Sequence, residues 1–95
     1  MQDIHTKEVD ELFDAILLLK DREECYKFFK DVLTIKEILD TAQRLKAAKM
    51  LRSNFSYVDV CQATGMSTAT ISRVSKSLEK GAGGYNIVLD RLGIK

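Results

Sequence analysis

Between residues 68 and 76, short hydroxyl and methyl side chains stand beside two cationic ones. If this segment is helical, its outward face carries Thr68, Ala69, Ser72, Arg73 and Lys76. Short side chains near the start of a helix let the helix enter the major groove of DNA, and cationic side chains further along reach the phosphates. The pattern therefore predicts binding to double-stranded DNA.

That face is useful only if its helix stands out from the body of the protein, which predicts a helix-turn-helix over residues 56–80. Gly65 lies in the turn between the two helices, where glycine can adopt a left-handed backbone conformation. Cys61, four residues earlier, is small enough for the two helices to approach closely. We expect the apolar residues Val60, Met66, Ile71, Val74 and Leu78 to pack inward.

The whole chain is expected to be helical, because it has no proline and only five glycines, too few to form the turns that separate many short strands. Caps and apolar periodicity predict six helices, over about 6–19, 21–32, 34–52, 56–64, 67–80 and 85–92. The apolar stripe of the third comprises Ile38, Ala42, Leu45, Ala48 and Leu51. Ninety-five residues suit one domain, so we predict a single all-α domain over residues 1–95.

The first predicted helix carries the run Ile16-Leu17-Leu18-Leu19, which is apolar on several sides. Such a helix needs neighbours on several sides, and a short chain supplies them most simply with a second subunit. We therefore predict a homodimer.

Charge is segregated along the chain, although the formal net charge is only +1. Residues 1–40 carry a net charge of −5, and residues 41–80 carry +5. A basic half beside an acidic half is typical of a protein that meets a polyanion with one part only. The basic half contains the predicted helix-turn-helix.

Several other classes of protein are not favoured. The longest aliphatic run, residues 15–19, is far shorter than the ~20 residues that span a bilayer, and residues 1–5 do not resemble a signal peptide. We expect a cytoplasmic protein that does not bind membranes. Cys25, Cys61 and the lone His5 form no metal-binding motif, so no metal site is predicted. No acidic pair has catalytic spacing, and we expect no enzymatic activity.

Residues 33–78 resemble the bacterial Trp repressor family, and most closely the branch whose effector is unassigned. The resemblance rests on Leu33-Thr34, Glu37, Arg44, Ala69-Thr70-Ile71-Ser72-Arg73, Ser75, Ser77 and Leu78, and covers about half of the chain without a gap. It implies an intertwined all-α dimer of six-helix subunits that reads DNA with two helix-turn-helix heads. Family positions near the operator fall on Thr68, Ala69, Thr70 and Ser72.

The resemblance also implies an effector pocket, at Thr34, Arg44, Arg73, Val74 and Ser77. The two arginines stand where the family sandwiches the indole of tryptophan, and one of them also holds its carboxylate. Val74, however, replaces the glycine that leaves room for the ring, so tryptophan is not expected as a ligand. Either a smaller effector binds there, or Val74 holds the helix-turn-helix in the position that binds DNA without any effector.

The leading hypothesis is a sequence-specific transcriptional regulator, a repressor, that reads a palindromic operator as a dimer. Two alternatives remain open at this stage. One is a small all-α dimeric enzyme of the chorismate-mutase type, in which Arg44 and Arg73 hold a dicarboxylate. The other is a helical adaptor that binds proteins through the apolar faces of residues 9–19.

Overall fold

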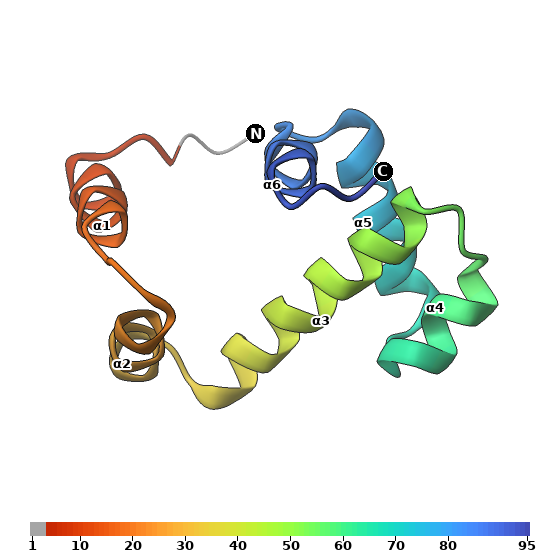
Figure 1. The fold of residues 1–95 in the computed structure, drawn as a ribbon, viewed down its shortest axis with the longest axis horizontal. Helices are drawn as coiled ribbons and strands as arrows, with labels where there is room; N and C mark the ends of the chain where they lie inside the picture. The colour runs from red at the N-terminus through yellow and green to blue at the C-terminus, as the bar shows by residue number, and fades with distance from the viewer. Residues whose placement is uncertain (1–3) are drawn as a thin grey trace. The chain divides into compact units, whose positions relative to one another are not determined.

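The computed structural model of the chain describes residues 4–95, and over that range it contains six α-helices and no β-strand (Figure 1). The helices are α1 (Lys7–Leu17), α2 (Arg22–Val32), α3 (Ile35–Arg52), α4 (Tyr57–Thr64), α5 (Thr68–Lys80) and α6 (Gly84–Arg91). The predicted all-α class and the number and order of the helices are confirmed. Within the described range, no helix is both long and apolar enough to cross a bilayer.

The chain divides into two compact units. The first unit, Met1–Ile35, holds α1 and α2, and the second, Lys36–Lys95, holds nearly all of α3 together with α4, α5 and α6. The single domain over residues 1–95 stays a prediction.

In the first unit, side-chain caps define where the helices begin. The Thr6 hydroxyl accepts a hydrogen bond from the Val9 amide at 3.2 Å at the start of α1. At the start of α2, the Asp21 carboxylate accepts from the Glu24 amide at 2.8 Å, and the Glu24 carboxylate accepts from the Lys20 amide at 2.9 Å. These bonds satisfy amides that the first helical turn leaves without backbone partners.

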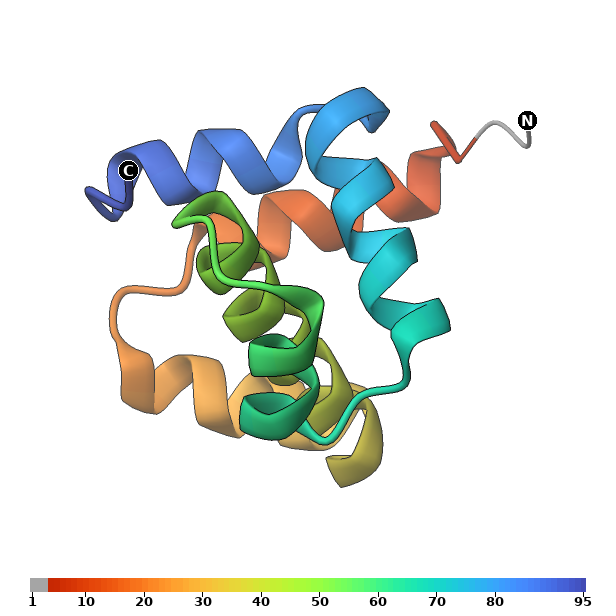
Figure 2. The ribbon, with the colours of Figure 1, turned by 90° about the vertical axis from the view of Figure 1, so that its right-hand side faces the viewer.

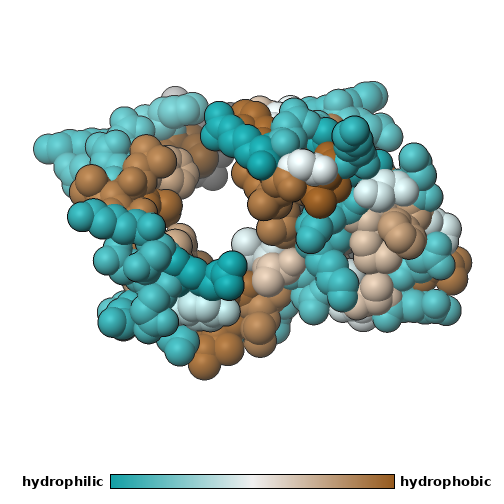
Figure 3. Space-filling view, viewed as in Figure 1, coloured by the Kyte–Doolittle hydropathy of each residue, from teal (hydrophilic) through white to brown (hydrophobic). Residues whose placement is uncertain are grey.

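Across residues 4–35, the described part of the first unit, no side chain is buried. Neither α1 nor α2 contains a buried residue, and Leu17 and Leu18 are 81% and 76% exposed. Figure 3 shows apolar surface over α1 and over the beginning of α3. The apolar face predicted for the first helix is thus present but uncovered.

The second unit is organised around a core to which all four of its helices contribute. The buried residues are Ala47, Ala48, Val60, Ile71, Val74 and Leu89. Within the apolar stripe predicted for α3, Ala48 is buried and Ala42 is exposed, and Ala47, outside the stripe, is also buried. Only the C-terminal half of α3 carries buried residues.

A short turn joins α4 to α5 (Figure 2), and a small set of hydrogen bonds fixes it. Gly65 has φ 71° and ψ 8°, and its amide donates to the Cys61 carbonyl at 2.8 Å. The Thr64 hydroxyl donates to the Val60 carbonyl at 2.7 Å and accepts from the Met66 amide at 3.2 Å. The left-handed glycine and the predicted positions of both helices are confirmed. The turn therefore sets the direction in which α5 leaves α4.

Gly65→Ala is expected to lower the free energy of unfolding by about 1 kcal/mol, because an L side chain is strained at positive φ. A methyl group there meets no atom within 4 Å, so the cost is conformational rather than steric. Gly84→Ala is the matched control, since Gly84 has no positive φ, begins α6 and also has open space around it. Urea unfolding at one fixed protein concentration gives the free energy of unfolding of both variants and of the wild type. Equal losses of stability would contradict the account of the turn.

Candidate nucleic-acid interface

Helix α5 turns one face inward and another outward. The Ser67 hydroxyl caps its first turn by accepting from the Thr70 amide at 3.2 Å. Ile71 is fully buried and Val74 is 4% exposed, so the side of the helix on which they lie is sealed against the core. The predicted DNA-contacting residues that are exposed are Thr68, Ala69, Arg73 and Lys76, and Ser72 is half-buried. The outward face therefore has the composition that the sequence predicts.

Thr70 occupies a different position from the other predicted contacts. It is half-buried, and its hydroxyl lies 3.0 Å from the Ser67 hydroxyl within the cap of α5. Its spacing aligns it with Val74 and Ser77 along the helix rather than with Thr68 and Ser72. A contact from Thr70 to DNA stays a prediction.

The cationic side chains of this face are available for an external partner. Within residues 4–95, no carboxylate lies within ion-pair distance of Arg73 or Lys76. Asp59, one of two acidic residues in 56–80, closes the capping box of α4: its carboxylate accepts from the Ser56 amide at 3.3 Å, and the Ser56 hydroxyl accepts from the Asp59 amide at 3.1 Å. Near the turn, the Lys46 ammonium donates to the Ala63 carbonyl at 3.3 Å.

A cavity of about 190 Å³ brings together four of the five residues predicted to form an effector pocket. It is lined by Arg44 of α3, by Thr70, Arg73, Val74 and Ser77 of α5, and by Tyr85 of α6. Thr34 belongs to the first unit, so its place in the pocket stays a prediction. Tyr85 was missed, because its spacing with the apolar residues of α6 suggested only a core position.

Val74 closes the inner end of this cavity. Its side chain is 4% exposed and belongs to the buried cluster, so it fills space that a glycine would leave open.

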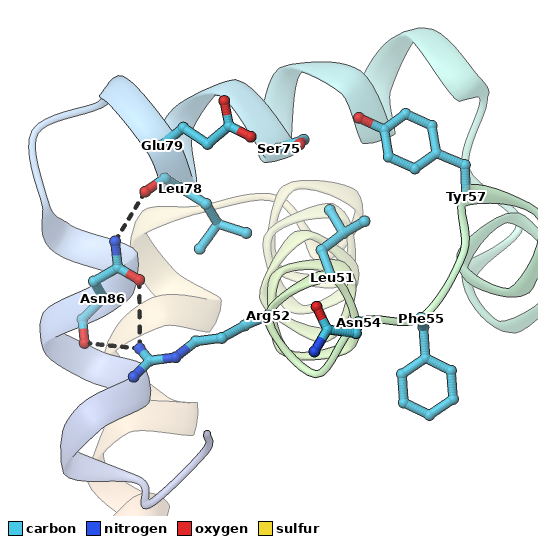
Figure 4. A pocket seen from close by; sticks show the side chains of 9 residues that line it. All are labelled: Leu51, Arg52, Asn54, Phe55, Tyr57, Ser75, Leu78, Glu79 and Asn86. Atoms are coloured by element: carbon cyan, nitrogen blue, oxygen red, sulfur yellow. Dashed lines mark hydrogen bonds between the residues drawn. The ribbon is translucent and has the colours of Figure 1, made fainter.

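A second hollow, of about 410 Å³, lies against another face of α5. One wall is a cluster of hydrogen bonds, shown with all nine lining residues in Figure 4. The Arg52 guanidinium donates to the carbonyl and to the side-chain oxygen of Asn86, at 3.4 and 3.3 Å, and pairs with Asp90. The Asn86 amide donates to the Leu78 carbonyl at 2.9 Å.

This cluster ties α3 and α6 to the last turns of α5, where carbonyls lack helical partners. Local sequence patterns could not reveal it, because Arg52 and Asn86 are 34 positions apart. Among the described residues, no group of three or more His, Cys, Asp or Glu side chains is placed to hold a metal ion.

Comparisons with known proteins agree with this geometry. The sequence model of the Trp repressor protein family matches residues 7–93. YerC of Bacillus subtilis, an uncharacterized protein, is 54% identical over 86 residues, which cover 90% of this chain and 83% of YerC.

Two crystal structures superimpose on nearly the whole chain. A TrpR-like protein from Eubacterium eligens is 54% identical, with a TM-score of 0.93, and the match covers 96% of this chain and 94% of that one. A candidate Trp repressor from Staphylococcus aureus is 49% identical, with a TM-score of 0.92, and the match covers 97% and 92%. The chain therefore belongs to the Trp repressor family, which is a family of regulators rather than of enzymes.

Proposed function

We propose that this protein is a sequence-specific, DNA-binding transcriptional repressor that reads a palindromic operator as a homodimer. The observation that carries the proposal is the outward face of α5, where Thr68, Ala69, Arg73 and Lys76 are exposed while Ile71 and Val74 hold the opposite side in the core. Membership of a family of helix-turn-helix regulators supports the same activity.

The chemistry of the face suits a duplex. Short side chains at the start of α5 let the helix backbone approach base edges, directly or through bridging water. Arg73 and Lys76 follow one to two turns later and reach phosphates on the groove wall. Two such heads about 34–36 Å apart, one turn of DNA, would read the two halves of a palindrome.

The uncovered apolar surface of the chain supports a dimer. Leu17 and Leu18 of the first unit are largely exposed, and in α3 Ile35 and Leu39 are 69% and 60% exposed. A monomer that left these side chains in water would forgo roughly 1.5–3 kcal/mol for each one that a partner could bury. A second copy of the chain, with the same apolar surface, supplies that partner.

We further propose that tryptophan is not the effector. The nearly buried Val74 side chain lines the cavity together with Arg44, Arg73 and Ser77, at the position where the family has the glycine that leaves room for the indole ring. A small polar effector is compatible with what remains.

Arg73→Ala is expected to weaken binding to a genomic fragment selected for specific binding about tenfold. It should also reduce the steepness with which the logarithm of the binding constant falls with the logarithm of the salt concentration, by roughly one per chain. Fluorescence anisotropy at several salt concentrations measures both quantities. Lys27→Ala, which removes the same charge from an exposed position of α2, is the matched control and should leave the affinity unchanged. Binding no tighter to any fragment than to random duplex would contradict the function.

The wild-type chain is expected to sediment at roughly 21 kDa, twice its subunit mass of 10.7 kDa. A double variant, Leu17→Glu with Leu18→Glu, should raise the dimer dissociation constant about a hundredfold or more, because two charged groups would have to be buried at the interface. The double variant Lys20→Glu with Lys27→Glu adds the same side chains at exposed polar positions of the same unit. Analytical ultracentrifugation over a dilution series compares them, and a monomeric wild type would refute the dimer.

Val74→Gly is expected to create a tryptophan site that the wild type lacks. The substitution removes a buried side chain and places glycine inside a helix, so it should also cost roughly 2–4 kcal/mol of stability. Calorimetric titration with tryptophan tests wild type and variant, after circular dichroism has shown that the variant is folded; Val74→Ala is the milder substitute. Tryptophan binding by the wild type as tight as by the variant would contradict the role of Val74.

A further inference from the structure

The cavity beside α5 presents two positive charges without internal compensation. Across residues 4–95, neither the Arg44 guanidinium nor the Arg73 guanidinium makes a hydrogen bond or an ion pair to another protein group. Asp40, one turn before Arg44, is instead bound by Lys36 at 2.6 Å. The remaining polar groups of the lining are the hydroxyls of Thr70, Ser77 and Tyr85. Guanidinium groups and hydroxyls can all donate hydrogen bonds, so the cavity is a set of donors around a cationic centre.

We propose that this cavity binds a small dianion, either a phosphate monoester or a short dicarboxylate. An arginine side chain matches the paired oxygens of phosphate or carboxylate, and the two arginines that line one cavity match two negative charges.

The position of Arg73 determines how the ligand acts on DNA binding. Arg73 aligns with Thr70 and Ser77, which line the cavity, and with Ala69 and Lys76 along the outward face. A dianion bound by Arg73 neutralises a charge that the outward face offers to phosphate, and it adds negative charge beside the duplex. The ligand therefore releases DNA instead of promoting its binding. This regulatory part rests on the proposed function; binding of the dianion does not.

The first experiment uses the full-length protein without DNA. Inorganic phosphate and succinate are titrated at constant ionic strength, with acetate as the singly charged reference, while NMR follows the Nε–H signals of Arg44 and Arg73. We expect saturable binding of one dianion per chain. The probe with the lower dissociation constant shows whether the ligand is a phosphate monoester or a dicarboxylate. Arg44→Gln should weaken binding at least tenfold. Lys49→Gln removes the same charge from an exposed position of α3 outside the cavity and should leave binding unchanged.

Failure to saturate with either probe, or equal weakening by Arg44→Gln and Lys49→Gln, overturns the site. The second experiment adds a selected genomic fragment, and a saturating dianion should raise the dissociation constant for DNA about tenfold in the wild type but not in Arg44→Gln. Tighter DNA binding with the dianion overturns the regulation. If no fragment binds specifically, the proposed function fails, while the titration without DNA still decides the ligand site.

Discussion

The burial of one side of α5 is the constraint on which the rest of this structure depends. Ile71 and Val74 are sealed in a core with Ala47, Ala48 and Val60. Because both residues belong to one stripe of the helix, their burial determines which side chains must point outward. Two adjacent alanines in α3 lack bulky side chains, which allows neighbouring helices to pack closely against that segment. The outward face of α5, which we propose reads DNA, is thus a consequence of packing on the other side of the same helix.

Val74 links this packing to regulation. A glycine in its place would leave the cavity open to a ring but would withdraw a side chain from the core. With valine, the core gains an apolar side chain, and Arg44 and Arg73 line the cavity beside it. We propose that valine in this position stabilises the helix-turn-helix at the expense of an aromatic ligand and leaves the two arginines to bind another anion.

Sequence patterns predicted the second unit well where the information is local. The caps at Ser56 and Ser67 and the glycine at position 65 specify α4, the turn and α5 because each acts through bonds to residues within four positions. Sequence patterns carry less information where distant packing decides the outcome. Ala42 and Ala47 are chemically identical, and only the placement of the neighbouring helices leaves the first exposed and the second buried. Tyr85 in the cavity and the Arg52–Asn86 bond likewise depend on tertiary contacts across many positions.

The most direct test of the central claim is an NMR map of the backbone amides of the labelled protein, titrated with the duplex fragment that it selects from genomic DNA. The account predicts that the largest shift changes fall on residues 67–76, at the start and along the outward face of α5, and that Ile87 and Val88 of α6, which are also exposed, change little. Changes concentrated in α1, α2 or α6, with α5 unaffected, would contradict it.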